Sequence, residues 1–291
     1  MRITSNMMAG NLVRRLNNNS TRVQKYQDQL SAAKRITKPS DDPIGLTASL
    51  RLRSTLVEMD RYKQNMEESK DWLTATSESL NKMGEVIHRL HELAVAGASS
   101  TVPQPALDAM ANEVDQMHEY LVDLANSDHG GRYLFAGQNT LTAPFTLGGP
   151  AGALDNGAIL REIARGQVMQ INTTPQFLAN PGSILKNVQN LANELRAGNY
   201  TGVSNLIGSL QANEDEILAM ESAVGAKINR LEMSAERSLE LQTSVTRLLS
   251  ETEDADIAEL TVRLGQEEAA YRAALTVGAR LIQPTLADFL R

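Results

Sequence analysis

The sequence predicts a mainly α protein, a long antiparallel helical rod or coiled-coil bundle formed by the N- and C-terminal halves, with a small β-rich insert at its distal end. Apolar residues recur at helical spacing along most of the 291 residues, and this spacing is lost only between about 130 and 182. Aromatic residues are 4% of the chain and hydrophobic residues 42%, which is typical of long helices and not of one dense aromatic core.

The first predicted element is a helix from about Asn6 to Ile36 that carries a coiled-coil stripe. Alternating steps of four and three residues select Leu12, Leu16, Asn19, Val23, Tyr26, Leu30 and Ala33. Residues that repeat every 3.5 positions lie along one side of a helix and form a seam. This seam predicts a partner helix.

A break and a long helix follow. Pro39 and Pro43 each bias the preceding residue away from the helical conformation, so the first helix ends before them. Asp42 can cap the next helix with Pro43 in its first position. That helix is predicted from Pro43 to about Ala96, with its apolar face formed by Leu56, Met59, Met66, Leu73, Leu80, Met83, Ile87, Leu90, Leu93 and Ala94.

A loop through Pro103 leads to a helix that ends near Asn126, with a stripe of Leu107, Met110, Val114, Met117, Leu121 and Leu124. The insert then contains two predicted short strands, at residues 132–136 and 143–147. Residues 158–163 and 167–172 alternate apolar and polar side chains around Arg165-Gly166, which predicts a hairpin.

Helices return at about 183–197 and 203–250, the second with a stripe of Ile217, Val224, Ile228, Leu231, Val245 and Leu249. An acidic break at 251–256 precedes a terminal helix from about Ile257. Its 4-3 stripe selects Leu264, Glu268, Tyr271, Leu275, Gly278, Ile282, Thr285 and Phe289. The two ends of the chain therefore carry matching seams.

The element order is nearly symmetric about the insert and predicts five segments. An N-terminal assembly helix at 1–40 pairs with a C-terminal one at 255–291. A rod segment at 41–130 pairs with return helices at 183–254, and 131–182 form a small variable domain. We expect the self-assembly and partner seam to consist of Leu12, Leu16, Val23, Tyr26, Leu30, Leu264, Tyr271, Leu275, Ile282 and Phe289.

Energetics indicate that the terminal pair is marginal alone. Burying a large apolar side chain contributes roughly 1.5–3 kcal/mol, whereas ordering the backbone costs about 1–2 kcal/mol per residue. Helical hydrogen bonds offset only part of this cost, because water supplied the same bonds before folding. We therefore expect neighbouring copies to complete the seams by mass action.

Composition excludes several classes of protein. The net charge of −7 argues against nucleic acid and anionic membrane surfaces as partners. The absence of cysteine excludes disulfides, Cys-ligated metals and thiol nucleophiles. The chain has no run of 18 apolar residues, so we expect no membrane span. The N-terminal sequence lacks an apolar region followed by a cleavage site, so we expect no cleaved signal peptide.

Candidate catalytic groups have simpler structural interpretations. His88 and His91 are three residues apart, which is not the His-Glu-x-x-His spacing of a zinc peptidase helix. The pairs Asp41-Asp42 and Asp254-x-Asp256 stand at predicted helix starts, where carboxylates cap free amides. We expect no enzyme, cofactor or metal site. A helical metalloenzyme that uses the two histidines remains the alternative from another class.

The chain resembles the flagellin superfamily of bacterial axial proteins. The resemblance rests on Met1–Thr4, on Lys34-Arg35-Ile36 with Pro39–Pro43, on Leu121–Asn126 and on Gly131–Gly137. It continues in Val224–Glu232, Asp254–Glu259 and Leu286–Leu290. The motifs cover both flanks, and only the insert lacks a distinctive match. Ala32-Ala33 stand where flagellins commonly have Ser-Gly.

The resemblance implies a structural role in the flagellum. The run Tyr133–Thr140 continuing to Pro144-Phe145, and the Asp288-Phe289-Leu290 ending, are more similar to the branch of the family that joins hook to filament. Such an adaptor is exported through the type III apparatus with a chaperone and forms a ring of copies between a neighbouring hook-associated protein and flagellin. A short flagellin and a non-flagellar coiled-coil module remain the alternatives.

Overall fold

The computed structural model describes residues 5–179 and 182–282. Its helices are α1 (Ser5–Ala32), α2 (Pro43–Gly97), α3 (Gln104–Ala125), α4 (Gln176–Ala179), α5 (Ile184–Arg196), α6 (Tyr200–Glu253) and α7 (Ile257–Ile282). Its strands are β1 (Asp128–His129), β2 (Arg132–Tyr133), β3 (Phe145–Thr146), β4 (Gly149–Pro150), β5 (Leu160–Ala164) and β6 (Gln167–Gln170). The predicted fold class, mainly helical with a small strand-containing insert, is confirmed.

The chain forms two compact units. Within the described residues, the first contains 5–58 and 241–282, and the second contains 59–179 and 182–240. The first turns of α2 and the last turns of α6 thus belong with the terminal helices. The five-segment division expected from the sequence remains a prediction.

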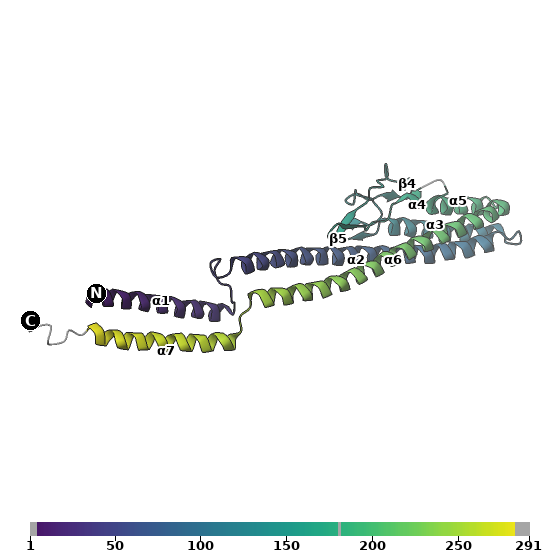
Figure 1. The fold of residues 1–291 in the computed structure, drawn as a ribbon. Helices are drawn as coiled ribbons and strands as arrows, with labels where there is room; N and C mark the ends of the chain where they lie inside the picture. The colour runs from purple at the N-terminus through teal and green to yellow at the C-terminus, as the bar shows by residue number, and fades with distance from the viewer. Residues whose placement is uncertain (1–4, 180–181, 283–291) are drawn as a thin grey trace, which may run out of the picture. The chain divides into compact units, whose positions relative to one another are not determined.

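In the first unit, α1 and α7 run antiparallel and pack side by side (Figure 1). The short connections 33–42 and 254–256 join them to α2 and α6. Backbone hydrogen bonds pair the two connections, since Lys34 and Asp254 form an isolated antiparallel bridge. The unit therefore consists of a helix pair that is anchored where the chain enters and leaves it.

The second unit is built on α2, α3, α5 and α6, with α3 packed along α5. The ion pair of Lys70 with Glu232 (2.7 Å) and the contact of His88 with Glu214 (3.3 Å) show that α2 and α6 run antiparallel here. The predicted stripes form the core, and Leu73, Leu80, Ile87 and Leu121 are completely buried, as are Met83, Leu90, Val114 and Leu107.

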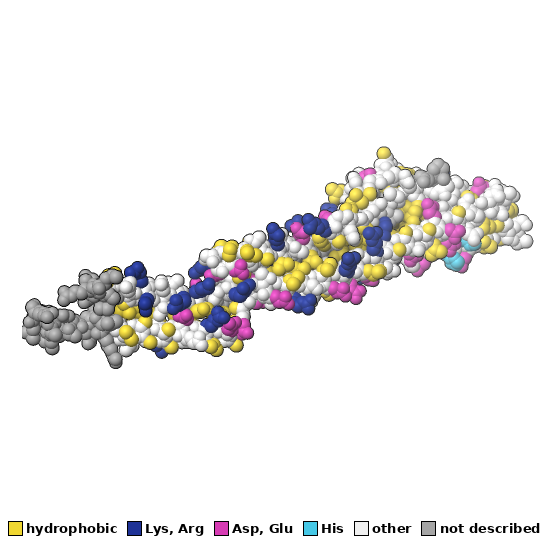
Figure 2. Space-filling view, viewed as in Figure 1, with side chains coloured by type: hydrophobic (Ala, Val, Ile, Leu, Met, Phe, Trp, Pro, Cys, Tyr) yellow, Lys and Arg dark blue, Asp and Glu magenta, His cyan; other side chains and the backbone are white. Residues whose placement is uncertain are grey.

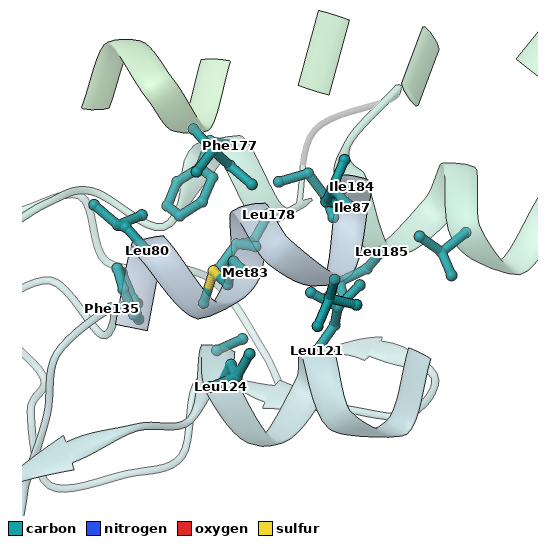
Figure 3. Packing of buried hydrophobic residues seen from close by; sticks show 14 of the residues in the cluster. Leu80, Met83, Ile87, Leu121, Leu124, Phe135, Phe177, Leu178, Ile184 and Leu185 are labelled. Carbon is teal, nitrogen blue, oxygen red and sulfur yellow. The ribbon is translucent and has the colours of Figure 1, made fainter. Parts of the chain in front are cut away.

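The insert closes one side of this core. Phe135, Phe177 and Leu178 meet Leu80 and Met83 of α2 (Figure 3). Its strands form three separate two-stranded antiparallel pairs, β1–β2, β3–β4 and β5–β6. The predicted hairpin is confirmed as β5–β6, with a bulge between Glu162 and Ala164. The insert packs onto the helices, and its buried side chains belong to the same hydrophobic core as theirs.

A buried amide network fixes α5 against α6. The Asn187 side-chain amide donates to Asn213 Oδ1 (2.7 Å) and to the Gly182 carbonyl (2.9 Å). Both asparagines are at least 95% buried. A buried amide needs all its partners, so any slip of the two helices would leave polar groups unsatisfied.

Several predicted boundaries were wrong. The strands predicted at 132–136 and 143–147 are only the two-residue β2 and β3, and α6 continues to Glu253, past the predicted end at 250. The first helix ends at Ala32, not Ile36, because Ala33 has a φ of +54° and Lys34 joins the bridge to Asp254. The turn predicted at 198–202 is shorter, since α6 begins at Tyr200. In addition, the short helix α4 was not predicted, because four residues are too few for a periodic signal.

We predict that Leu80→Ala lowers the free energy of unfolding of the second unit by about 2–5 kcal/mol, because it leaves a cavity in a close-packed core. Urea titration followed by Trp72 fluorescence measures this, since the single tryptophan is buried in the same core. Leu218→Ala, at a side chain 63% exposed, is the matched control and should change the value by less than about 0.5 kcal/mol. Equal losses would contradict the assignment of the core.

Candidate assembly interface

The predicted seam of α1 faces α7. Leu12, Leu16, Val23, Tyr26 and Leu30 all lie on this side of α1 at intermediate exposure. None of the five is fully buried. The seam therefore gains only part of the roughly 1.5–3 kcal/mol that each large apolar side chain gives on full burial.

The seam of α7 follows most of the predicted stripe. The buried or half-buried positions are Leu260, Leu264, Glu267, Glu268, Tyr271, Ala274 and Gly278. Leu264, Glu268, Tyr271 and Gly278 were predicted, whereas the predicted Leu275 is 44% exposed. The side chain of Ile282 and all of Phe289 lie outside the described residues. The assembly role of these residues remains a prediction.

A small residue is required near the end of the pair. A Cβ added at Gly278 would lie 2.8 Å from Leu12 Cδ2, closer than real Cβ atoms normally approach a neighbour. Further along, the Arg22 guanidinium bonds Glu267 (3.0 Å) across the seam. The pair is thus held by a few close contacts and an exposed ion pair, which contributes at most about 1 kcal/mol.

Much apolar surface of the first unit stays open to solvent. Val13, Val262, Leu275 and Val277 are 44–60% exposed on α1 and α7. A groove of about 530 Å³ also runs between the two helices, lined by Leu12, Arg15, Asn18, Asn19, Arg22, Ala273, Ala274 and Val277. Figure 2 shows Lys and Arg side chains, with Asp and Glu among them, over α1 and its connection to α2. The terminal pair therefore presents an apolar surface with a charged border.

Glu253 is the centre of the joint between the terminal pair and the adjoining helices. Its side chain is 8% exposed and receives Lys34 Nζ and the Arg53 guanidinium, whose Nε lies 3.1 Å from Oε2. Its backbone carbonyl accepts the Arg35 N–H (2.7 Å). The Arg53 guanidinium, helped by Lys34, lowers the pKa of Glu253 against the effect of burial. One carboxylate thus joins α6, α2 and the first connection.

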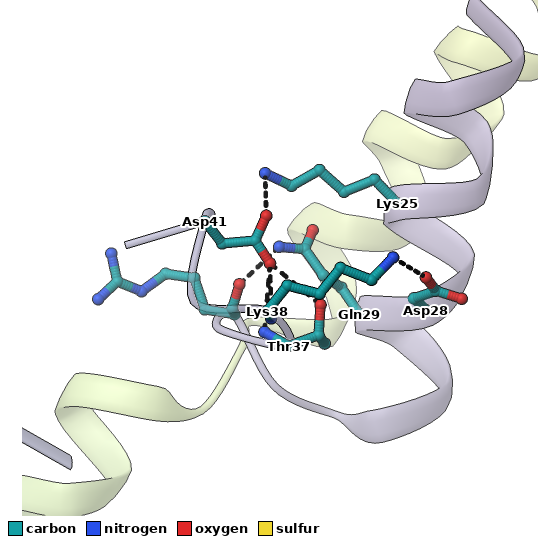
Figure 4. A network of polar contacts seen from close by, with 7 residues as sticks. Lys25, Asp28, Gln29, Thr37, Lys38 and Asp41 are labelled. Atoms are coloured by element: carbon teal, nitrogen blue, oxygen red, sulfur yellow. Dashed lines mark hydrogen bonds and ion pairs between the residues drawn. The ribbon is translucent and has the colours of Figure 1, made fainter. Parts of the chain in front are cut away.

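Asp41 organises the first connection (Figure 4). One carboxylate oxygen accepts the N–H groups of Thr37 (3.3 Å) and Lys38 (3.0 Å) and the Thr37 hydroxyl (3.1 Å). The other oxygen lies 2.9 Å from Lys25 Nζ. Burial alone would raise the pKa of Asp41, but these donors lower it to about 2. The carboxylate therefore needs its charge to hold the loop.

The helix-capping prediction is confirmed for two carboxylates. Asp42 Oδ1 accepts the Gly45 N–H (2.8 Å) at the start of α2. Asp256 Oδ1 accepts the N–H groups of Ala258 (2.9 Å) and Glu259 (3.1 Å) at the start of α7. Each cap contributes on the order of 1 kcal/mol to its helix. Asp41 and Asp254 serve the connections instead.

The histidines form no cluster that suits a metal. His88 is exposed and contacts Glu214, and within residues 5–179 and 182–282 no group of three or more His, Asp or Glu side chains is arranged to hold an ion. His118 lines a cavity of about 100 Å³, and burial lowers its pKa. In the same described part, no helix is long and apolar enough to cross a bilayer.

Sequence reasoning missed the joint. Glu253 was assigned only to an acidic break, and Lys34 and Arg53 carried no predicted role. Lys34 and Arg53 are both far from Glu253 in the sequence, and Arg53 precedes it by 200 residues. No local pattern therefore relates these side chains. The one available signal was a basic pair directly after one seam and an acidic run directly before the other.

We predict that Glu253→Gln loosens the joint. It removes the charge that Lys34 and Arg53 share, and because both cations stay about half exposed, we expect a loss of about 1–3 kcal/mol. Limited proteolysis should then cut faster within residues 33–42 and 254–256. Glu251→Gln, at a nearby exposed carboxylate, should leave the cleavage rate unchanged. Equal rates in both variants would contradict the role of Glu253.

A second prediction concerns acid. Because the pKa of Asp41 is lowered from 3.8 to about 2 in the folded chain, its contribution is complete above about pH 4 and is lost as the pH falls toward 2. Urea unfolding followed by circular dichroism between pH 5 and pH 2 should show this loss. Asp41→Asn should be less stable at pH 5 and should lose less on acidification. Parallel pH profiles would refute the assignment.

The chain is similar in sequence to known flagellar proteins. Residues 3–140 match the bacterial flagellin N-terminal helical region. Flagellar hook-associated protein 3 of Escherichia coli K12 is 29% identical over 147 residues, which are 50% of this chain and 46% of that protein. The chain thus spans about half the length of this curated relative. A flagellin of Halalkalibacterium halodurans is 21% identical over 89% of this chain and 88% of its own.

The fold has a solved counterpart. A protein from Vibrio parahaemolyticus described as flagellar hook-associated aligns with a TM-score of 0.67 at 20% identity, over 74% of this chain and 100% of that one. At this identity the likeness shows the fold alone. The N-terminal half of the chain is thus similar to the bacterial flagellin N-terminal region and to a flagellar hook-associated protein.

Proposed function

We propose that this chain is a structural axial component of the bacterial flagellum, an adaptor that joins the hook to the flagellin filament. The observation that carries the proposal is the incomplete burial of the terminal helix pair. Its seam is only half buried, and apolar side chains such as Leu275 and Val277 remain about half exposed. Such surfaces mark sites where other proteins bind.

Assembly would supply the missing burial. A partner that binds only the folded pair raises its free energy of unfolding. This gain grows with the logarithm of the ratio of the partner concentration to the dissociation constant. Packed copies raise that effective concentration strongly. An open seam in a free chain is therefore what a subunit of a ring or tube requires.

The proposed partners follow the names of the relatives. Further copies of this chain would form a ring, with a hook-associated protein on one side and flagellin on the other. The likeness to a hook-associated protein supports a position next to the hook, and flagellin is the neighbour that an adaptor to the filament would need. An export chaperone and the type III export apparatus would deliver the chain, without a cleaved signal peptide, to the extracellular flagellum. We assign the chain no catalytic role.

A short flagellin is the second candidate. The likeness to the Halalkalibacterium halodurans flagellin extends over 89% of this chain, which favours it. The adaptor is preferred because the run Tyr133–Thr140 continuing to Pro144-Phe145 is more similar to the branch of the family that joins hook to filament. A coiled-coil module outside the flagellum is the third candidate, and it predicts well-ordered termini that resist proteolysis.

Labelled electron microscopy tests the proposal. The adaptor should occupy only the hook–filament junction, whereas a flagellin should label the whole filament. Purified chain seeded with filament fragments should not elongate into long fibres. Label along the filament, or growth from seeds, would refute the adaptor, and absence of label from flagella would refute both flagellar functions.

A variant sharpens this test. Leu275→Asp should remove label from the junction, since a charge would enter an apolar contact, yet the monomer should keep its helical circular dichroism because Leu275 is 44% exposed. Leu141→Asp changes a side chain that is 77% exposed on the insert and should assemble normally. A loss of monomer helicity in Leu275→Asp would contradict the interpretation.

A further inference from the structure

The α1–α7 pair has two unlike flanks. We define the groove flank by Arg15 and Arg22 of α1 with Ala273 and Val277 of α7, which line the groove of about 530 Å³. We define the knob flank by Val13 of α1 with Ile257 and Leu275 of α7. The two flanks lie on opposite sides of the plane in which the helices pack.

Helical geometry separates the flanks. Residues two apart on an α-helix point about 200° away from each other, so Val13 lies opposite Arg15 and Leu275 lies opposite Val277. Ile257 precedes Leu275 by eighteen residues, which is about five full turns, so these two share one side. Consistent with this, Leu275 does not line the groove, whereas Ala273, Ala274 and Val277 do.

The shapes of the flanks are complementary. Small alanines form the α7 wall of the groove, which leaves room for side chains from outside. The knob flank instead presents large apolar side chains, with Leu275 44%, Ile257 45% and Val13 50% exposed. Insertion of large side chains into spaces between smaller ones is the packing mode of coiled coils.

The charges are complementary as well. Of the two arginines that line the groove, Arg22 is already paired with Glu267 (3.0 Å), whereas Arg15 forms no ion pair among the described residues. The knob flank carries Glu268, seven residues before Leu275 and therefore on the same side of α7. Within the described part of the chain, Glu268 has one ion pair, a 3.7 Å contact with Arg272, whose side chain is 80% exposed and free to move aside.

We propose that the groove flank of one copy receives the knob flank of the next copy, with Glu268 facing Arg15. This rests on the proposed assembly function and specifies its geometry. Like flanks would oppose arginine to arginine and leave both apolar surfaces unfilled. A contact between unlike flanks is heterologous, so it continues from copy to copy into a ring or helix and does not stop at a dimer.

Disulfide cross-linking tests this, because the chain has no cysteine of its own. Cells that lack the natural chain express two variants together, each with a single cysteine. One mixture combines Leu275→Cys chains with Val277→Cys chains, and the other combines Val13→Cys chains with Ala273→Cys chains. Flagella are isolated and oxidised. Mixed flagella should give about tenfold more cross-linked dimer than flagella with either variant alone, since a disulfide needs its two Cα atoms within about 7 Å.

Two results would overturn the proposal. The first is equally strong cross-linking in flagella that contain a single variant, because like flanks would then meet. The second is label at the junction without cross-linking in either mixture. Flagella that contain none of the chain would refute the proposed function instead, so the two failures are distinct.

A charge exchange gives an independent readout. Arg15→Glu should reduce the amount of chain at the junction several-fold, because the substituted carboxylate would face Glu268 of the next copy. Adding Glu268→Arg to the same chain reverses both charges of every contact and should restore the amount. Failure of the double variant to recover, with each variant still helical as a monomer, would refute the pairing.

Discussion

The carboxylate of Glu253 links the last turn of α6, the early turns of α2 and the connection that follows α1. Around it, backbone hydrogen bonds join Arg35 to Glu253 and Ala255 to Ala33. The terminal helices can pair only if their two connections leave α2 and α6 at the same level and in fixed directions. Asp41, Asp42 and Asp256 then hold the connections and begin the helices. The geometry of the first unit depends on this ionic joint.

The two units differ in how they are stabilised. The second has a completed core, with residues from four helices and the insert fully buried. The first has a half-buried seam, a groove and exposed leucines and valines. A chain that completes one unit alone and leaves the other for its neighbours separates folding from assembly. This division gives physical content to the proposed adaptor, because a subunit must be stable before it is incorporated.

Hydrophobic periodicity, and its loss in the insert, was sufficient to predict the β5–β6 hairpin and every helix except α4, because each depends on residues close in sequence. The seam of α1 was also predicted, from Leu12 to Leu30. On α7 fixed steps of four and three residues selected Leu275, which is 44% exposed, whereas its neighbour Ala274 is half-buried. The joint could not be predicted, since nothing local relates Lys34 or Arg53 to Glu253. Flank complementarity likewise needed the register of α1 against α7.

The bridge between Lys34 and Asp254 also has a kinetic consequence. It closes a loop of 220 residues, the difference between positions 254 and 34, whereas α2 with α3 and α5 with α6 are neighbours along the chain. Loop-closure entropy opposes distant contacts, and topologies with many of them form slowly. The helical hairpins of the second unit should therefore form early and the bridge late. If the chain is exported unfolded, as proposed, the terminal helices would still be unpaired when the middle has folded, and would be free to meet a neighbouring copy first.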